Sequence, residues 1–465
     1  MTAIVVVGDA LLDRDVLGTV ERLSPDAPVP VVDQDAVRTR PGGAGLAALL
    51  AAGDADAVTL VTALGDDPAG AELRRLLVEH GIDVVDLGLD GATPEKVRIG
   101  TPGRPLLRLD AGGGGAVGEP DAAVRAAIGW ADAVLVADYG RGVADVPAIR
   151  AQLELAASPV VWDPHPRGAE PVPRAALVTP NLAEARGFRP GPDDDATPAV
   201  ARRARALAAR WQAAAVCVTC GARGAVLVHG DGPPLAVPAE AATNGDTCGA
   251  GDRFASRVAV ALADGASTVD AVVAAVAAAS RFVAAGGAAA VAGPRQTRSP
   301  AAGEDGDRYP VDDDDAGALA ERVRSRGGTV VATGGCFDLL HPGHIRTLQA
   351  ARALGDCLVV CINSDASARR LKGAGRPVVA QHDRVAVLRA LACVDAVIVF
   401  DEDTPAAALE RLRPDVWAKG GDYAGRELPE AAVLARWGGE VVLVPFLHGK
   451  STTRIIQEAS LHAIG

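Results

Sequence analysis

The sequence predicts two α/β domains joined by a linker, and three observations lead to this fold class. The chain has 465 residues, more than one ordinary hydrophobic core holds. Short apolar runs ending in Gly, Asp or Asn alternate with Ala- and Leu-rich helical stretches, a pattern typical of a mostly parallel sheet wrapped by helices. A stretch rich in Pro, Gly and Asp, residues 294–328, interrupts this rhythm. We therefore predict domains over residues 1–297 and 328–465, with a linker over 298–327.

The composition excludes several classes of protein. A hydrophobic fraction of 49% with 23% charged residues indicates a globular protein, and the net charge of −13 argues against a nucleic-acid groove. No signal-peptide pattern follows Met1. Residues 271–292 are apolar, but Arg281 and the pair Gly286-Gly287 interrupt them and favour a buried helix over a membrane span. Seven cysteines, an odd number, indicate reduced thiols. We expect a cytoplasmic protein that binds neither nucleic acid nor membrane.

Acidic residues and glycines follow the first predicted strand, residues 4–7. Asp9 and Asp13 come directly after it, and they either bind sugar hydroxyls or cap the next element. Gly42 and Gly43 form a flexible turn that opens a helix. In parallel α/β sheets ligands lie beyond the carboxyl ends of the strands, so we expect a ligand at this edge.

Three cations lie farther along the first domain. Lys96, Arg98 and Arg108 occur on alternating stretches typical of strands. They present positive charge to a substrate phosphate, or they decorate a solvated edge strand. The sequence alone favours neither alternative.

The motif D-T-C-G-A-G-D, residues 246–252, carries the strongest signal in the first domain. Gly249, Ala250 and Gly251 are small enough for backbone N–H groups at a helix start to converge on a phosphoryl group and form an anion hole. Asp252 at that mouth can accept the proton of an attacking hydroxyl. The alternative is an ordinary Asp cap after a glycine turn, but a helical run over 254–263 follows this motif, and the full pattern is rarer than a simple cap.

These residues resemble the ribokinase-type sugar kinase family. Asn181 and Glu184 match the N-x-x-E motif of that family, which implies roles in binding phosphate and Mg²⁺, with Glu184 as the metal-linked residue. Asp9 and Asp13 match its substrate-binding carboxylates, the Gly42-Gly43 turn matches its sugar-side glycine motif, and Asp138 at another strand end is assigned to the sugar as well. The resemblance covers residues 1–297 and implies a ribokinase-like fold.

The second predicted domain opens with T-G-G-C-F-D-L-L-H-P-G-H, residues 333–344, after the apolar run 330–332. Pro342 suits the first turn of a helix. His341 and His344 are three residues apart, so they share one face of that helix start. Two imidazoles beside free helix N–H groups make a site for polyphosphate.

This signature resembles the cytidylyltransferase-like nucleotidyltransferases, which have a Rossmann-like fold and release pyrophosphate from a nucleoside triphosphate. Lys419 stands beside two glycines at a predicted strand end, where packing alone hardly explains a lysine, and we expect it to act in catalysis with His341 and His344. Other cations, hydroxyls and signature residues are placed to bind ATP: Thr333, Gly334, Phe337, Arg384, Ser451, Thr452 and Thr453.

A ribokinase-type domain followed by a nucleotidyltransferase domain resembles the bifunctional D-glycero-β-D-manno-heptose 7-phosphate kinases and heptose 1-phosphate adenylyltransferases. Segments such as Arg376-Pro377-Val378 strengthen the likeness. The resemblance implies ATP and Mg²⁺ at both sites, phosphorylation of C1 of heptose 7-phosphate, and formation of ADP-heptose from heptose 1-phosphate. Sugar phosphates and ATP are then the partners, and we expect a homodimer.

Four positions in the first domain depart from the family pattern. Leu46 replaces an asparagine, His165 and Arg141 each replace a lysine, and the bulky Arg253 replaces a small hydroxyl residue after the proposed base. Leu46 lacks the hydrogen-bonding groups of asparagine, which weakens the expected sugar recognition. Three hypotheses stay open: the bifunctional enzyme, a transferase with a kinase-like scaffold or sensor, and a kinase–transferase for another sugar or polyol phosphate that uses ATP, CTP or GTP.

Overall fold

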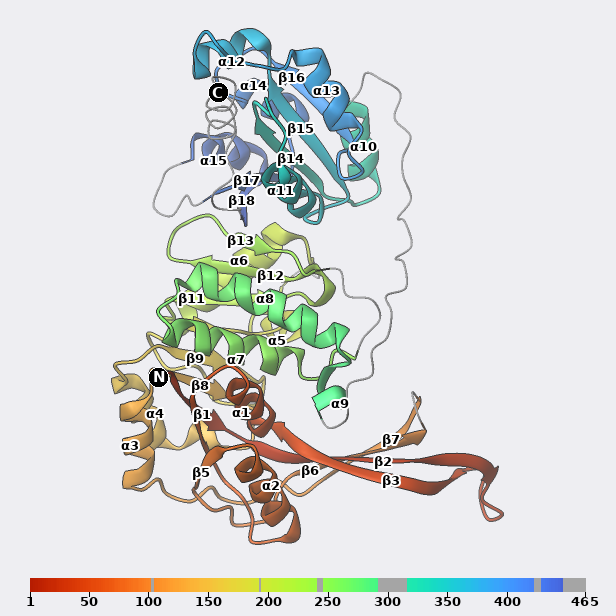
Figure 1. Ribbon diagram of the computed structural model, residues 1–465, viewed down its shortest axis with the longest axis vertical. Helices are drawn as coiled ribbons and strands as arrows, with labels where there is room; N and C mark the ends of the chain where they lie inside the picture. The colour runs from red at the N-terminus through yellow and green to blue at the C-terminus, as the bar shows by residue number, and fades with distance from the viewer. Residues whose placement is uncertain (102–103, 192–193, 241–245, 292–315, 422–427, 446–465) are drawn as a thin grey trace, which may run out of the picture. The chain divides into compact units, whose positions relative to one another are not determined.

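The computed structural model describes residues 1–465 except 102–103, 192–193, 241–245, 292–315, 422–427 and 446–465 (Figure 1). Contacts divide the chain into two units. The first consists of Met1–Pro190, Ala206–Thr219 and Ala239–Ala301. The second consists of Gly191–Arg205, Cys220–Pro238 and Ala302–Gly465. Each unit is an α/β structure.

A parallel sheet forms the centre of the first unit. Its strands follow the order β11-β10-β9-β8-β1-β4-β5, and every pair in this order is parallel. The strands are β1 (Ala3–Gly8), β4 (Ala57–Thr62), β5 (Ile82–Asp86), β8 (Ala133–Ala137), β9 (Val160–Asp163), β10 (Leu177–Val178) and β11 (Ala215–Thr219).

The central strand β1 shows why this sheet is buried on both faces. Residues Ile4 to Val7 are all at most 3% exposed, which matches their continuous apolar run. β1 pairs with β4 on one side and with β8 on the other. Strand β5, which follows β4, is added on one side of β1, and strands β9 to β11, which follow β8, are added on the other side. Ligands bind at such a switch point, beyond the carboxyl ends of the strands.

A second, four-stranded sheet extends from the first unit, with the order β3-β2-β6-β7. Figure 1 shows the long ribbon of β2 and β3 reaching away from the helices. Its strands are β2 (Ala10–Leu23), β3 (Pro30–Gly43), β6 (Glu95–Thr101) and β7 (Arg104–Ala111). The alternating stretches around Lys96, Arg98 and Arg108 are therefore strands, as the sequence predicts.

Helices α1 and α7 pack against the parallel sheet, on β1, β4, β8 and β9, and they contact each other. The helices of this unit are α1 (Ala44–Ala52), α2 (Pro68–Glu79), α3 (Ala122–Trp130), η1 (Val143–Asp145), α4 (Pro147–Leu155), α5 (Leu182–Phe188), α7 (Ala250–Ala263), α8 (Thr268–Ala284) and α9 (Gly287–Val291). The described part of the apolar stretch, 271–291, falls on α8 and α9, and α9 begins at Gly287 of the Gly286-Gly287 pair. Among the described helices, none combines the length and apolar character that crossing a bilayer requires.

The second unit contains a five-stranded parallel sheet with the order β16-β15-β14-β17-β18. Its strands are β14 (Val330–Gly335), β15 (Cys357–Asn363), β16 (Ala396–Phe400), β17 (Val416–Gly420) and β18 (Glu440–Val444). The helices are α10 (Ala316–Ser325), α11 (Pro342–Arg352), α12 (Asp365–Lys372), α13 (Gln381–Arg389), α14 (Ala406–Leu412), α15 (Pro429–Leu434) and η3 (Ala435–Trp437). Residues 194–205 and 220–238 add the first part of α6 (Thr197–Trp211), η2 (Gly221–Arg223) and the antiparallel pair β12 (Ala225–His229) and β13 (Leu235–Val237).

Alternation along β14 builds a core on each face of this sheet. Val330 and Ala332 pack with Leu319 of α10 and Leu409 of α14. The residue between them, Val331, packs in a second core with the helices on the other face, α11 and α13. Both units thus confirm the predicted α/β fold class.

Candidate active sites

The proposed base of the kinase site, Asp252, lies in the first turn of α7 and is only 6% exposed. Burial raises the pKa of this carboxyl to about 7, although the hydroxyl of Tyr139, which donates to Oδ1 over 2.6 Å, acts in the opposite direction. Burial also raises the pKa of Tyr139 well above its ordinary value, so the phenol keeps its proton and remains the donor. A carboxylate that titrates near neutrality is suited to accept a proton.

The predicted anion hole is the start of α7. Gly249 caps the helix with a left-handed backbone, φ 80°, and no side chain caps the first turn. The N–H of Ala250 donates to Thr247 O over 3.1 Å, whereas Gly251 and Asp252 lie where a helix offers their N–H groups no carbonyl partner. Open space surrounds the Cα of Gly251 on its side-chain side. The geometry leaves room for an anion at this point.

Helix α9 supports the loop that precedes the anion hole. The N–H of Ala288 donates to Cys248 O over 3.0 Å. Gly287 has φ 63°, and a Cβ there would lie 2.2 Å from Asp246 O, so only glycine fits beneath the loop. Close packing against this loop thus explains why a glycine stands at position 287.

Two of the predicted sugar-binding aspartates follow neighbouring strands. Asp9 accepts N–H groups of Tyr139, Arg141 and Val143 at 2.9–3.1 Å, so its carboxylate holds the loop after β8 in place. Burial raises the pKa of Asp138 to about 7, although the N–H of Gly140, 2.7 Å from Oδ1, acts against this rise. Between the two alternatives for Asp9, the geometry favours a role in organising the site.

A third carboxylate, Asp163 at the end of β9, was not among the predicted site residues. Burial raises its pKa well above the usual range, and the charge of Glu184 adds to the rise, while the Thr179 hydroxyl donates to Oδ1 over 2.8 Å and opposes it. Asn181 and Glu184 form a capping box at the start of α5, with bonds of 2.8 and 2.9 Å. The described residues contain no group of three or more side chains arranged to hold a metal ion.

The four-stranded sheet presents charged residues on one face. The register places them in two cross-strand rows, Arg40–Asp13–Lys96–Asp110 and Arg38–Asp15–Arg98–Arg108. Nη1 of Arg98 donates to Asp13 Oδ1 over 2.7 Å, and its Nη2 lies 3.8 Å from Cys248 Sγ in the loop before the anion hole. The structure therefore brings the predicted sugar-binding sheet next to the predicted phosphate site.

The other two cations of this face differ in their surroundings. Arg108 is exposed and pairs with Asp110 over 2.7 Å. Lys96 is half-buried, and its charge acts to lower the pKa of Asp252. Among the described residues, none forms a hydrogen bond or an ion pair with the ammonium group of Lys96, so this group is available to a substrate.

Two of the departures from the family pattern, Leu46 and His165, lie close to this site. Leu46 is 2% exposed and packs beneath Gly249, where a Cβ would lie 2.9 Å from Leu46 Cδ2. His165 accepts the N–H of Arg167 through Nδ1 over 3.2 Å, and burial, assisted by the charge of Arg167, lowers the pKa of its imidazole. Gly42 contacts Asp13, since a Cβ at Gly42 would lie 2.6 Å from its Oδ2.

In the second unit, the two histidines of the signature stack on each other. Their ring centroids are 3.9 Å apart with an interplanar angle of 27°. His341 caps α11 and Pro342 opens it, as predicted. Burial lowers the pKa of His344 to about 4, with a further contribution from His341. The imidazole of His344 is therefore neutral at pH 7.

The signature strand positions the histidines. The hydroxyl of Thr333 donates to Ala418 O over 2.8 Å, which ties β14 to β17. A Cβ at Gly334 would lie 2.5 Å from the Trp417 ring, so a larger residue does not fit. Phe337 adopts a left-handed φ of 45°, and its ring centroid lies 5.3 Å from that of His344.

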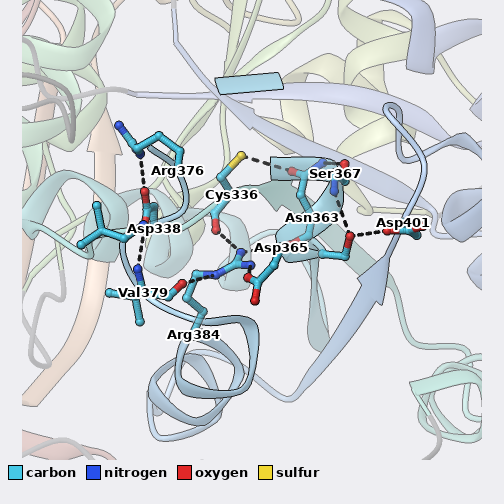
Figure 2. Close-up of polar contacts among 11 residues, drawn as sticks. Cys336, Asp338, Asn363, Asp365, Ser367, Arg376, Val379, Arg384 and Asp401 are labelled. Atoms are coloured by element: carbon cyan, nitrogen blue, oxygen red, sulfur yellow. Dashed lines mark hydrogen bonds and ion pairs between the residues drawn. The ribbon is translucent and has the colours of Figure 1, made fainter. Parts of the chain in front are cut away.

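Arg384 does not lie open to a ligand, contrary to the prediction that it binds ATP. It is 2% exposed, and Figure 2 shows its guanidinium among protein acceptors. The acceptors are Val379 O at 3.0 Å, Cys336 O at 2.7 Å, Asn363 O at 3.0 Å and Asp365 Oδ1 at 2.8 Å. Four of its five N–H groups are thereby occupied. This geometry assigns Arg384 to holding the loops of the site together.

Asp338, a residue of the signature, also holds loops of this site together, but as a hydrogen-bond acceptor. It accepts the N–H groups of Val378 and Val379 at 2.7 and 3.0 Å, and it also pairs with Arg376 (Figure 2). Its carboxylate thus anchors the Arg376-Pro377-Val378 segment next to the histidines. No motif chemistry indicates this partner, because the two segments are 38 residues or more apart in the chain.

Lys419 is the penultimate residue of β17 and donates through Nζ to Glu430 Oε1 over 2.9 Å. Its side chain is 24% exposed, so part of it faces solvent. The predicted ligands Ser451, Thr452 and Thr453 lie outside the described residues.

Comparison with known proteins identifies a family for each part of the chain. Residues 1–293 match the pfkB family carbohydrate kinases, and residues 332–458 match the cytidylyltransferase-like family. The chain is similar to the structure of Arabidopsis thaliana ribokinase complexed with ribose and ATP, with a TM-score of 0.51 and 21% identity, over 61% of this chain and 93% of that one. This likeness confirms the ribokinase-like fold.

Two relatives match almost the whole chain. The bifunctional protein HldE of Streptomyces coelicolor is 58% identical over 461 residues, 99% of this chain and 97% of its own length. The bifunctional protein HldE of Azorhizobium caulinodans is 39% identical over 477 residues, 99% of this chain and 98% of its own. The chain therefore belongs to the HldE family of bifunctional heptose kinases and adenylyltransferases.

Proposed function

We propose that the enzyme makes ADP-heptose in two separate steps, one in each proposed domain, residues 1–297 and 328–465. The first step phosphorylates C1 of D-glycero-β-D-manno-heptose 7-phosphate. The second joins heptose 1-phosphate to the adenylyl group of ATP. The observation that carries the first assignment is Arg98, which contacts both Asp13 of the sugar-side sheet and Cys248 of the phosphate-side loop.

In the kinase step the sugar lies against the charged face of the four-stranded sheet. Lys96, Arg98 and Arg108 bind the C7 phosphate through charge-assisted hydrogen bonds, while Asp13 and Asp138 accept hydroxyls of the sugar. The C1 oxygen attacks the γ-phosphorus of ATP, ADP leaves, and Asp252 takes the hydroxyl proton. The N–H groups of Gly251 and Asp252 bind the transferred phosphoryl group.

The carboxylates beside this site fit Mg²⁺ bound mainly through ATP. Mg²⁺ commonly takes one or two protein carboxylates together with phosphate oxygens and waters. Asp163 and Glu184 supply such a pair, and burial together with the nearby charge of Glu184 raises the pKa of Asp163. When bound there, the ion would offset the charge of the ATP phosphates. Asn181 shapes this end of the site as the cap of α5.

In the transferase step the C1 phosphate of the sugar attacks the α-phosphorus of ATP, and pyrophosphate leaves. His341 and His344 donate hydrogen bonds to the phosphate oxygens on which charge develops, while Lys419 supplies a positive charge. Thr333, Gly334 and Phe337 hold the histidines beside the helix start. Ser451, Thr452 and Thr453 remain proposed ATP ligands from the end of the chain.

A separate phosphatase must act between the two steps. The kinase product is a bisphosphate, whereas the transferase uses the C1 phosphate as its nucleophile. A remaining C7 phosphate would bring further negative charge into a pocket suited to a hydroxyl, and burying it unpaired is costly.

The test is an assay of the purified full-length protein with heptose 7-phosphate, ATP and Mg²⁺. The bisphosphate should accumulate with little pyrophosphate release, and addition of a C7-specific phosphatase should start production of ADP-heptose. Rapid formation of the nucleotide sugar without a phosphatase would contradict the two-step scheme. A panel of sugar phosphates with ATP, CTP and GTP then tests the choice of sugar and base.

We also infer that the enzyme is a cytoplasmic homodimer, since its substrates, ATP and sugar phosphates, are intracellular metabolites. The face opposite the charged rows of the four-stranded sheet carries the apolar row Val37–Val16–Ile99–Leu107. Val37 and Leu107 are 42% and 57% exposed, and a second copy of this face offers a matching apolar partner. The paired change Leu107→Asp and Leu109→Asp should yield monomers in analytical ultracentrifugation. An unchanged mass would overturn this interface.

A further inference from the structure

Arg253 immediately follows the proposed base, yet its side chain turns to helix α1. Its Nη1 donates to Asp54 Oδ2 over 2.6 Å and to Leu50 O over 3.2 Å. The side chains of Arg253 and Asp54 are 17% and 26% exposed. The bulk of Arg253 therefore does not obstruct the anion hole.

The end of α1 is a favourable place for this guanidinium. Helix α1 spans Ala44–Ala52, so Leu50 O belongs to its last turn, where carbonyl groups lack helical partners. A cation there interacts well with the negative end of the helix dipole, and Asp54 adds a full negative charge. Arg253 thus joins the first turn of α7 to the last turn of α1.

The same helix contacts α7 at a second point and the sugar side at its start. Leu46 packs beneath Gly249, the cap of α7. Gly43 caps the other end of α1, and the adjacent Gly42 contacts Asp13. Helix α1 therefore connects the predicted sugar-binding glycines with both ends of the first turn of α7.

We propose that Arg253 and Asp54 are positioning residues that fix the base and the anion hole relative to the sugar. The proposal rests on the proposed role of Asp252. In it, helix α1 holds the sugar-binding glycines and the first turn of α7 at a fixed separation. A phosphoryl acceptor and donor must meet in close alignment, so a small shift of α7 lowers turnover more than it lowers affinity. Arg253, which replaces the small hydroxyl residue of the family pattern, then stabilises the position of α7 in the kinase site.

The test compares Arg253→Ala, Asp54→Ala and the double variant in the full-length enzyme. We expect kcat of the kinase to fall roughly ten- to hundredfold in each single variant, because misplaced reacting groups cost about that much, with KM for the sugar within about twofold. The double variant should be no worse than either single one, since both remove the same contact. Arg253→Lys should restore part of kcat. Adenylyl transfer should not change.

Arg210→Ala is the matched control, because it breaks another Arg–carboxylate pair of the same unit, with Glu170, on an exposed surface. A fall in the unfolding temperature with kcat unchanged would overturn the proposal, and so would additive losses in the double variant. If Arg253→Ala does not fold, Asp54→Asn, which keeps the shape of the side chain, decides the matter by the same measurements. Retained kinase activity in Asp252→Asn would instead overturn the proposed function.

Discussion

The two sites use burial in opposite ways. In the kinase site, burial raises the pKa of Asp252 and Asp138 to about 7, so these acids hold protons at a pH where exposed aspartates do not. In the transferase site, burial lowers the pKa of His344 to about 4, so this base stays neutral. In both sites burial therefore disfavours the charged form of the side chain. Asp252 becomes a proton acceptor that titrates close to pH 7, whereas His344 becomes an uncharged hydrogen-bond donor.

This difference follows from what each reaction needs. The kinase must remove a proton from a sugar hydroxyl, which requires a base that titrates close to the working pH. The transferase uses a phosphate that is already ionised as its nucleophile, so no base is needed there, and hydrogen-bond donors for departing pyrophosphate suffice. The same desolvation therefore serves proton transfer in one unit and anion stabilisation in the other.

Asp252→Asn should produce the largest effect. It removes the proposed base while keeping the shape of the side chain, so kcat of the kinase should fall by roughly 10²- to 10⁴-fold. Adenylyl transfer from heptose 1-phosphate, measured in the same preparation, should stay at the level of the unchanged enzyme. Loss of both activities in a folded protein would mean that the two sites are not independent.

His344→Ala should give the reverse pattern. Loss of one donor to the developing charge should lower kcat of adenylyl transfer by roughly 10²- to 10³-fold, with kinase turnover preserved. His382→Ala is the control, since this histidine of the same unit is exposed and lies outside the signature. Equal losses in both variants would remove the special role of His344.

The pH profiles of the two activities should also differ, by a smaller factor than the two substitutions cause. Because Asp252 must be ionised to accept a proton and its pKa is about 7, kcat/KM of the kinase should fall about tenfold for each pH unit below 7. Because the pKa of His344 is about 4, kcat/KM of adenylyl transfer should stay level from pH 8 to about 5. A transferase profile that bends near pH 6.5, the value of an exposed histidine, would contradict the neutral imidazole.

Tyr139→Phe should have the smallest effect at pH 8. The phenol stabilises the ionised form of Asp252, so its removal should raise the pKa of the base and shift the acid limb of the kinase profile upward by roughly one unit. Turnover at pH 8 should therefore fall less than turnover at pH 6. The adenylyl transfer profile of the same variant is the internal reference, and a kinase limb that stays in place would show that this hydrogen bond does not tune the base.

The fold class follows from the sequence because local patterns encode it, and other local patterns indicate the candidate chemical residues. The D-T-C-G-A-G-D motif predicts the start of α7, and the H-x-G-H spacing predicts the paired rings of His341 and His344. Only part of the charged face of the four-stranded sheet can be predicted from the sequence. Alternation places Lys96 and Arg98 on one face of a strand, but the sequence does not show that Asp13, on another strand, lies opposite Lys96.

What the sequence does not predict depends on contacts between distant segments. Tyr139 reaches Asp252 across 113 positions of the chain. Arg384 has the charge and the helix-start location of a phosphate ligand, yet three backbone carbonyls and a carboxylate surround it. Whether a cation meets a ligand or the protein itself is decided by packing, which motif spacing does not report.

The support that α9 gives to the anion-hole loop also limits how such an enzyme can be assembled from modules. Gly287 and Ala288 lie directly under Asp246 and Cys248, so the last short helix of the first unit belongs to its phosphate site. A kinase gene truncated after α8 would encode the base but not the floor of the loop beside it. A C-terminal fusion that keeps the kinase active must therefore begin after α9, and these few residues are part of the active module.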